Sequence, residues 1–560
     1  MTADHIHNAV AEALGRLVAS SFASRLWQRD STLWPEPSPG GDPADRTLGW
    51  LDLPGRLPML AEKFSGLTGE LSDDGFTDAV VLGMGGSSMT PLTLGRIFDK
   101  SDPALQGLRL HALDTVNPDS ITRLADSLDL ARTLFFVSSK SGTTVEPLSL
   151  EAFFRSRLSV PTTGADSMTS AVGPGGGRRN FVALTDPGTP MSERARAGEF
   201  GTWVATPEDV GGRFSALSAF GMMPAAAAGM DLHRFAESAA SMADRCLRDS
   251  ADNPGLQLGA FMAANALAGR DKVTLITSGE YSVFGLWVEQ LLAESTGKGG
   301  KGLIPIAGEP RLRPESYGND RQFIVFDTGE ADSQFQQAQK ELESAGHPVL
   351  VIKASGSDKH EIAGEFFRWQ FATAAAASLM DIYPFDQPDV EAAKVKSREL
   401  LSETGQSPVT YSLVSALDRL GNIAPPSYVA LIAYLPESPE LTAAFTGLRR
   451  LISEKTGMAT TFGYGPRYLH SIGQLYKGGP RNATVLGFVS GKYDDLAVPD
   501  TSYTFGQLSA AQAAGDFAVM TEYGQTVLPI RPEDGQIEAL ATAIASGIRL
   551  RRDPDSESIT

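Results

Sequence analysis

One stretch decides the fold: Phe135-Phe136-Val137-Ser138-Ser139-Lys140-Ser141-Gly142-Thr143-Thr144-Val145-Glu146. Its first three residues form an apolar run that is typical of a buried strand. Hydroxyl side chains then surround Lys140 and Gly142, where glycine allows backbone geometry that other residues resist. From Val145 the sequence indicates a helix, whose free N–H groups and positive dipole end would face this loop. The pattern predicts a phosphate-binding loop, although a Ser/Thr-rich turn capped by its own side chains looks the same.

A second glycine-rich turn lies upstream, in Thr77-Asp78-Ala79-Val80-Val81-Leu82-Gly83-Met84-Gly85-Gly86-Ser87-Ser88. A strand feeds this turn and a helix follows it. The turn nearly matches the dinucleotide-binding fingerprint, but Ser88 stands where that fingerprint has its last glycine. Rossmann-type binding is therefore the alternative interpretation of this turn.

Further strands are predicted on either side of these loops, at Leu108–Leu113, Thr133–Val137 and Asn180–Leu184, with helical spacing between them. Alternation of strands and helices predicts an α/β fold with a doubly wound parallel sheet. Ligands of such sheets bind outside the carboxyl ends of the strands. We therefore expect both loops at one edge of the sheet, which favours phosphate binding over a simple capped turn.

The alternation continues along the chain. A second half begins near residue 253, with strands at Val273–Thr277, Phe323–Phe326 and Val349–Ile352 and a long buried helix at Glu361–Met380. A third section contains a convincing strand at Tyr428–Tyr434. We expect an N-terminal helical segment (residues 1–60), two α/β domains (61–250 and 251–395) and a C-terminal α/β section (396–560) that completes the site.

Composition narrows the function classes. The chain has 560 residues, a net charge of −19 and 42% hydrophobic residues, so it has ample core and no basic surface for non-specific nucleic-acid binding. A small anionic ligand is still allowed, because local cations and helix ends override the global sign. The single Cys246 excludes an internal disulfide framework, is expected in the core, and fits a reducing cytoplasm. No metal-ligand cluster, signal peptide or membrane-spanning run is found, which predicts a soluble cytoplasmic protein.

Three residues outside the loops are candidates for chemistry. Arg213 follows two glycines, which would let it approach a ligand closely, although most arginines beside turns are surface residues. Glu294 is placed in the last turn of a helix, where the dipole disfavours a carboxylate and would raise its pKa toward that of a useful base. The competing interpretation is a solvated glutamate paired with Lys298. His470 lies beside a Gly-Pro turn and an arginine, and is preferred over the other six histidines.

With these residues identified, the chain resembles the glucose-6-phosphate isomerases, which belong to the sugar-isomerase (SIS) fold group. The anchors occur in family order: Gly85-Gly86-Ser87, Ser139-Lys140-Ser141-Gly142-Thr143-Thr144, Gly211-Gly212-Arg213, Glu294-Ser295-Thr296-Gly297-Lys298 and His470. Two stretches, residues 383–390 and 463–470, are most similar to the isomerase half of bifunctional transaldolase–isomerases. The α/β alternation leaves no room for a transaldolase barrel. The resemblance implies two SIS domains with an additional C-terminal α/β section.

The resemblance also implies roles for individual residues. Glu294 would move a proton between C2 and C1, Arg213 would stabilise the enediolate, and His470, donated by a neighbouring subunit of a homodimer, would open the sugar ring. Gln290 would line the site one helical turn before Glu294. The sugar phosphate would be bound by Ser139, Lys140, Ser141, Thr143 and Thr144, with Gly86 and Ser87 lining the same pocket. The chemistry requires no metal or redox cofactor, since a carboxylate base and a fixed arginine suffice for aldose–ketose exchange.

The chain departs from the family at one position. Members usually carry a C-terminal lysine that assists ring opening, and the corresponding stretch Tyr503–Gln512 contains none. Lys477, placed on roughly the same helical face as His470, is one candidate substitute. Alternatively, His470 acts alone or the ring opens spontaneously.

Two other functions compete with the isomerase. A non-catalytic SIS-fold regulator would need the phosphate loop but neither Glu294 nor His470. A nucleotide-dependent enzyme would use the turn at residues 83–88, which lacks its final glycine. Acceptance of mannose 6-phosphate as a second substrate stays open, as does action together with a separate transaldolase.

Overall fold

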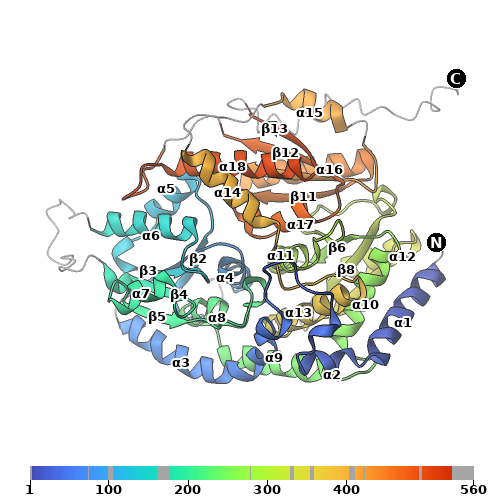
Figure 1. Ribbon diagram of the computed structural model, residues 1–560, viewed down its shortest axis with the longest axis horizontal. Coiled ribbons are helices and arrows are strands. Elements are labelled where there is room, and N and C mark those ends of the chain that lie inside the picture. The colour runs from blue at the N-terminus through green and yellow to red at the C-terminus, as the bar shows by residue number, and fades with distance from the viewer. Residues whose placement is uncertain are drawn as a thin grey trace.

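The computed structural model describes residues 3–73, 75–98, 105–159, 177–277, 279–327, 333–353, 358–402, 410–420, 423–490 and 495–532. These residues contain three parallel sheets with helices packed around them (Figure 1). The predicted fold class, doubly wound α/β with a further α/β section, is confirmed. The Gly-, Ser- and Thr-rich stretch at residues 161–178, which its composition predicts to be an insertion, falls almost wholly outside the described residues, as does the polar C-terminal tail at residues 551–560.

The first sheet has the order β2-β1-β3-β4-β5. Its strands are β1 (Asp78–Gly83), β2 (Arg109–Leu113), β3 (Thr133–Ser138), β4 (Phe181–Thr185) and β5 (Thr202–Ala205). All pairs are parallel, and Gly83 of β1 stands opposite Ser138 of β3. The carboxyl ends of the two predicted loop-bearing strands are therefore adjacent, as the sequence predicted. β5 was not predicted, because four residues are too few for a periodicity signal.

The second and third sheets have the orders β7-β6-β8-β9 and β11-β10-β12-β13, and both are parallel. The second comprises β6 (Lys272–Thr277), β7 (Ile304–Ile306), β8 (Arg321–Asp327) and β9 (Val349–Lys353). The third comprises β10 (Tyr428–Tyr434), β11 (Ala459–Tyr464), β12 (Ala483–Val489) and β13 (Thr526–Ile530). The strands predicted in these parts are present, and β7, β11, β12 and β13 are additional.

The helices cover the sheets and the spaces between them. The first part contains α1 (Ala3–Ala19), α2 (Phe22–Trp27), α3 (Leu53–Asp73), α4 (Gly86–Ile97), α5 (Pro118–Ser127), α6 (Val145–Leu158), α7 (Pro190–Arg196), α8 (Ala219–Ala227) and α9 (Leu232–Cys246). The remainder contains α10 (Pro254–Leu267), α11 (Phe284–Thr296), α12 (Ser333–Ser344), α13 (Ile362–Leu379), α14 (Val390–Ser402), α15 (Leu413–Leu420), α16 (Pro439–Thr456), α17 (Gly473–Gly478) and α18 (Phe505–Glu522). Short 3-10 helices include η3 (Gly49–Asp52), η6 (Gly212–Phe214), η8 (Pro314–Ser316) and η10 (Arg467–His470). None of the described helices is long and apolar enough to cross a membrane.

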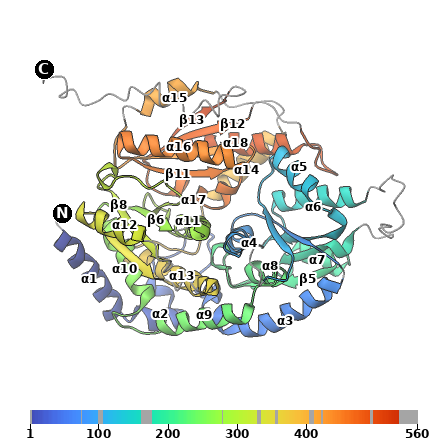
Figure 2. The same ribbon diagram turned by 180° about the vertical axis from the view of Figure 1, so that it is seen from behind.

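Figures 1 and 2 show how the three sheets are arranged. From both sides, the first and second sheets lie next to each other and the third lies across one end of the pair. Helix α3 runs continuously through residue 60 and α14 through residue 395. The expected domain limits at these residues thus fall inside helices, and the four-part division stays a prediction.

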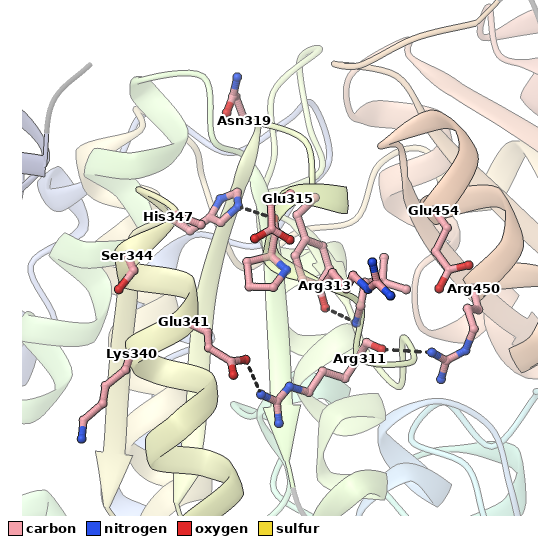
Figure 3. A pocket seen from close by; sticks show the side chains of 14 residues that line it. Arg311, Arg313, Glu315, Asn319, Lys340, Glu341, Ser344, His347, Arg450 and Glu454 are labelled. Carbon is pink, nitrogen blue, oxygen red and sulfur yellow. Dashed lines mark hydrogen bonds and ion pairs between the residues drawn. The ribbon is translucent and has the colours of Figure 1, made fainter. Parts of the chain in front are cut away.

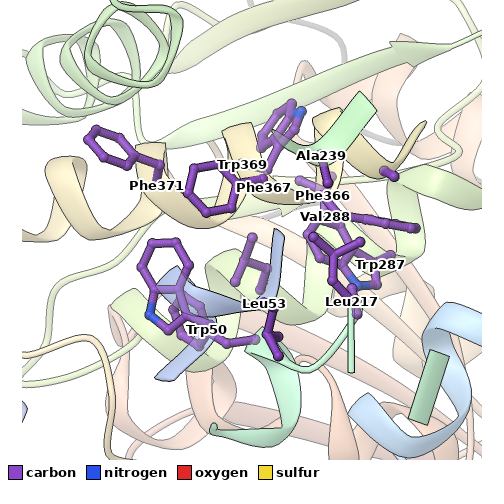
Figure 4. Close-up of a cluster of buried hydrophobic side chains, with 14 of the residues drawn as sticks. Trp50, Leu53, Leu217, Ala239, Trp287, Val288, Phe366, Phe367, Trp369 and Phe371 are labelled. Carbon is purple, nitrogen blue, oxygen red and sulfur yellow. The ribbon is translucent and has the colours of Figure 1, made fainter. Parts of the chain in front are cut away.

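A large aromatic and aliphatic core joins the first two sheets (Figure 4). Helix α13 lies in its middle, and every residue from Ile362 to Ala377 is buried, as predicted for this long helix. Trp50 stacks on Phe214 with ring centroids 5.4 Å apart and also contacts Phe367. The expected core position of Cys246 is confirmed. Because Phe214 is anchored in this core, the short turn that also carries Arg213 is held rigidly.

Candidate active site

The predicted phosphate loop lies between β3 and α6. Gly142 has φ of +66°, which only glycine adopts easily, and α6 begins at Val145. The loop hydroxyls pair with each other: Ser139 Oγ is 2.9 Å from Thr144 Oγ1, and Ser141 Oγ is 2.9 Å from Thr143 Oγ1. These groups and the first N–H groups of α6 form a set of donors suited to an anion.

The two glycine-containing loops are joined directly. Ser138 Oγ donates to the carbonyl oxygen of Ser87, 3.1 Å away. A Cβ added at Gly86 would lie 1.9 Å from the carbonyl oxygen of Gly212, and one at Gly85 would lie 2.6 Å from that of His470. The glycines therefore allow the Arg213 turn and the His470 segment to pack against the N-terminus of α4. This packing fills the space next to the turn with protein backbone, which disfavours the dinucleotide interpretation.

Lys140 is held by the protein itself in this structure. Its ammonium group pairs with Asp186 and donates to the carbonyl oxygens of Pro207 and Glu208, each 3.1 Å away. It thereby ties the phosphate loop to the ends of β4 and β5. Contact with a substrate phosphate would require the ammonium group to exchange one of these partners.

Glu294 and Arg213 form a buried pair at the carboxyl end of α11. Glu294 is 6% exposed and Arg213 is 4% exposed. Arg213 Nη1 lies 3.5 Å from Glu294 Oε2, and Arg213 Nε donates to Ser295 Oγ at 2.8 Å. Burial raises the pKa of Glu294 above its ordinary value, against the opposing charge of Arg213. A raised pKa was expected from the helix dipole, and the structure makes burial its main cause.

Residues 383–386 hold two cations, Arg213 and Lys298, in place beside Glu294. Arg213 Nη2 donates to the carbonyl oxygens of Pro384 and Asp386. Lys298 Nζ donates to the carbonyl oxygen of Tyr383 at 2.7 Å and pairs with Asp386 Oδ1 at 2.9 Å. The alternative pairing of Glu294 with Lys298 is therefore wrong, because Lys298 takes Asp386 as its carboxylate partner.

His470 pairs with Glu146, a buried carboxylate on α6. His470 Nε2 lies 2.9 Å from Glu146 Oε1, and the same oxygen accepts a hydrogen bond from Gln512 Nε2 at 2.7 Å. Burial pushes the pKa of Glu146 up, but His470 and Gln512 outweigh it, and the pKa is lowered overall. Glu146 is therefore a stable anion beside the imidazole.

The structure corrects one expectation about His470 and offers an alternative to another. First, His470 ends the one-turn helix η10, and Ser471 has non-helical backbone angles (φ −133°, ψ −77°) before α17 begins at Gly473. His470 and Lys477 therefore do not share a helical face. Second, the imidazole is bound to Glu146 of the same chain, which offers an alternative to its donation by a neighbouring subunit.

Lys477, on α17, is buried against α18. Its ammonium group pairs with Asp516 Oδ1 at 2.6 Å and donates to the carbonyl oxygen of Gly473 at 3.1 Å. Its side chain is 1% exposed, and the Asp516 side chain is fully buried. These contacts favour a structural ion pair over ring-opening chemistry for Lys477.

Gln290 connects the two halves of the site. Its Nε2 donates to the backbone oxygen of His470 at 3.0 Å and lies 3.4 Å from Glu294 Oε1. The amide oxygens of Gln290 and Gln512 are both buried and, within the described part of the chain, have no hydrogen-bond partner. Buried acceptors of this kind normally have partners. The hydroxyl groups of a sugar would satisfy them.

Sequence reasoning missed three participants: Glu146, Gln512 and Asp386. Glu146 belongs to the predicted helix start but was not singled out. The signal available was a carboxylate in the first turn of a helix that faces a phosphate loop, where its charge competes with that of the ligand. Gln512 and Asp386 carry no local signal, because their partners are distant in the sequence.

A separate surface cavity of about 1130 Å³ lies between η8, α12 and α16 (Figure 3). Arg311 pairs with Glu341 at 2.9 Å there, and Arg450 Nη1 donates to the carbonyl oxygen of Arg311 at 3.2 Å. Both acidic and basic side chains line it, and it contains none of the predicted site residues. The chemistry is therefore assigned to the Glu294–His470 site.

Comparison with known proteins identifies the family. Residues 59–302 match the family model described as phosphoglucose isomerase. A glucose-6-phosphate isomerase from Symbiobacterium thermophilum is 30% identical over 405 residues, which cover 64% of this chain and 87% of that protein. One from Rubrobacter xylanophilus is 27% identical over 390 residues, covering 61% of this chain and 88% of that protein.

Solved structures share the fold. A hypothetical protein from Thermus thermophilus superposes with a TM-score of 0.58 and 24% identity, covering 71% of this chain and 98% of that one. A glucose-6-phosphate isomerase from Chlamydia trachomatis gives a TM-score of 0.50 with 19% identity, covering 69% and 78%. The fold and site define an aldose–ketose isomerase of the SIS type. The chain belongs to the phosphoglucose isomerase family.

Proposed function

We propose that the chain interconverts D-glucose 6-phosphate and D-fructose 6-phosphate through a cis-enediol intermediate, a step of glycolysis and gluconeogenesis. The observation that carries the proposal is the buried Glu294–Arg213 pair, a base with a raised pKa beside a fixed cation. This pair lies on the other side of Gln290 from the His470–Glu146 pair. A site with both pairs can open a sugar ring and then move a proton.

Ring opening is assigned to His470. The C1–O5 bond breaks, O5 gains a proton and the O1 hydroxyl loses one, so the step consumes no external acid. The imidazole can exchange these protons with the substrate, because its contact with Glu146 through Nε2 fixes the orientation of the ring.

Isomerisation is assigned to Glu294. Its carboxylate removes the proton from C2 of the open-chain aldose and returns it to C1, while the proton of the C2 hydroxyl moves to the oxygen on C1. Arg213 is held by Ser295 and two backbone carbonyls, so its charge needs no rearrangement to stabilise the enediolate. The reaction balances internally and needs no external oxidant or reductant.

The phosphate group is assigned to the loop residues Ser139, Lys140, Ser141, Thr143 and Thr144, with Gly86 and Ser87 beside them. Two helices, α4 and α6, begin at this edge and direct free N–H groups toward it. Binding energy from the phosphate, remote from the reacting carbons, holds the open chain against Glu294.

In this proposal one chain supplies all of these groups. Two contacts hold the segment of η10 and α17 against the rest of the chain. The Arg467 guanidinium pairs with Asp114, just after β2, at 2.7 Å, and Gln474 donates to the carbonyl oxygen of Gly297, just after α11, at 2.9 Å. A homodimer stays a prediction, but the chemistry does not depend on it. A location in the reducing cytoplasm is likewise proposed from the single buried cysteine.

The alternative is a non-catalytic regulator on the same fold. Such a protein would bind the sugar phosphate through the loop and would have no use for the Glu294–Arg213 pair. The intact pair and the hydrogen-bonded arrangement around His470 favour the enzyme.

The test is a coupled assay on the purified chain. Fructose 6-phosphate is supplied, and glucose 6-phosphate is read through a dehydrogenase that forms NADPH. We expect turnover in the wild type and a loss of about 10²- to 10⁴-fold in Glu294→Gln, with sugar-phosphate affinity retained. Glu289→Gln is the matched control, since Glu289 is a buried carboxyl on the same helix whose pKa is raised by burial to about 8, and glutamine resembles its protonated form.

Binding without turnover in the wild type would contradict the proposal and favour the regulator. An unchanged rate in Glu294→Gln would remove this residue from the mechanism. Mannose 6-phosphate is tested in the same preparation, with a coupling system for its own product, and the ratio of the two rates measures discrimination at C2.

A further inference from the structure

Gln512 is a buried glutamine with one end bound and the other free. It lies on α18 and is 5% exposed. Its Nε2 donates to Glu146 Oε1 at 2.7 Å, whereas its Oε1 is buried and has no partner among the residues that the structure describes. A buried polar atom without a hydrogen-bond partner costs free energy. The unpartnered amide oxygen of Gln512 therefore points to a ligand group that pairs with it.

The orientation of this amide follows from its neighbour. Glu146 is an anion, because the charge and hydrogen bond of His470, a backbone hydrogen bond and the hydrogen bond from Gln512 together outweigh the effect of burial and lower its pKa. A carboxylate only accepts hydrogen bonds, so the amide nitrogen must face it. The amide oxygen of Gln512 is therefore turned away from Glu146.

The location is informative as well. Gln512 ends the stretch Tyr503–Gln512, in which the family-type lysine is missing. It nevertheless reaches Glu146, and through the same carboxylate oxygen it is connected to His470. A neutral amide cannot supply a proton, so Gln512 would act here by holding Glu146 and by accepting a hydrogen bond.

We propose that Gln512 is a positioning residue for ring opening: it holds Glu146 against His470, and its amide oxygen accepts a hydrogen bond from a hydroxyl of the cyclic sugar phosphate. This inference rests on the proposed isomerase function. It assigns no proton transfer to Gln512, and the proton exchange with O1 and O5 stays with His470.

The test variant is Gln512→Met, which keeps the length of the side chain and loses both polar contacts. Ring opening is measured without isomerisation, as exchange between the α and β anomers of glucose 6-phosphate by NMR. We expect anomer exchange and turnover on the cyclic substrate to fall about 10- to 100-fold. Affinity for 6-phosphogluconate, which is already acyclic, should stay within about twofold of that of the wild type.

A pH profile separates this role from a structural one. Gln512 stabilises the charged form of Glu146, so its removal raises the pKa of Glu146. The acidic limb of anomer exchange, a step that does not use Glu294, should therefore move to higher pH in Gln512→Met. A general loss of stability would not move this limb.

Gln525→Met is the matched control. Gln525 is similarly buried at 4% exposed, but both ends of its amide are satisfied, by Tyr476, Pro480 and Ala483. We expect this variant to unfold at lower temperature, with anomer exchange and the acidic limb unchanged.

The outcomes are distinct. If Gln512→Met folds and keeps both its anomer exchange and its acidic limb, the inference is overturned. If it does not fold, Gln512→Glu, which has the same shape and places a second carboxyl beside Glu146, is measured instead, with the same upward shift of the limb expected. Failure of the underlying function would show differently, as absence of isomerisation in the wild type.

Discussion

The origin of His470 is tested by mixing two inactive variants, Glu294→Gln and His470→Ala. In the structure, His470 Nε2 lies 2.9 Å from Glu146 Oε1, and its backbone oxygen accepts from Gln290 at 3.0 Å, all within one chain. Each chain in the mixture then carries one broken site. We expect no recovery of activity, whether or not the chains associate.

The magnitude of the opposite outcome follows from symmetry. If His470 came from a partner, random pairing would make about half of the dimers mixed, and each would contain one intact site of two. The mixture would recover about a quarter of the wild-type activity. Loss of a general acid–base residue leaves each variant about 10²- to 10⁴-fold slower, so a quarter stands well above the background.

The assay uses coexpressed chains with two different tags, which verify that mixed assemblies form, and turnover is measured on the whole unfractionated preparation. The control is wild type coexpressed with the double variant Glu294→Gln/His470→Ala. A site within one chain leaves about half of the activity in that control, whereas a shared site leaves about a quarter, because mixed dimers are then inactive. Recovery near a quarter in the first mixture would refute the single-chain site.

Three further outcomes are expected. Glu289 keeps its proton in the folded state up to about pH 8 and releases it above about 4.5 when unfolded, so stability should fall as pH rises through that window, and thermal unfolding of Glu289→Gln should lack this slope. The acidic limb of kcat/KM is expected at a pH above the pKa of an ordinary glutamate, because the pKa of Glu294 is raised. The charge of Arg213 favours the carboxylate form of Glu294, so its removal in Arg213→Gln should move the limb to still higher pH. An unmoved limb would show that Arg213 does not influence the group that titrates. Gly297→Ala should cost about 1–3 kcal/mol of unfolding free energy, since its Cβ would lie 2.5 Å from the backbone of α17, whereas Gly66→Ala in open space should not destabilise; equal melting temperatures would contradict this packing.

The phosphate loop and the sheet edge were predictable from sequence because both depend on short-range order. Alternation of strands and helices implies parallel sheets, and parallel strands bring their carboxyl ends to one edge. The loop at residues 139–144 and the turn at residues 85–87 were thus placed together, as the pairing of Gly83 with Ser138 confirms. Arg213 and Glu294 were also singled out from the sequence, because each lies in a short motif with a glycine neighbour, and the structure brings their side chains within 3.5 Å of each other.

The ring-opening half of the site was beyond the reach of sequence patterns. Glu146 is separated from His470 by 324 positions and from Gln512 by 366, and no periodicity relates residues so far apart. The source of His470, the pairing of Lys298 with Asp386 and the burial of Lys477 against Asp516 likewise depend on how the third sheet packs on the first two. Sequence by itself determined the alternation of strands and helices, the two loops and the candidate base, because these depend on residues that are neighbours in the chain. Only the tertiary structure decided which charges meet, because burial and pairing depend on distances that the chain closes by folding.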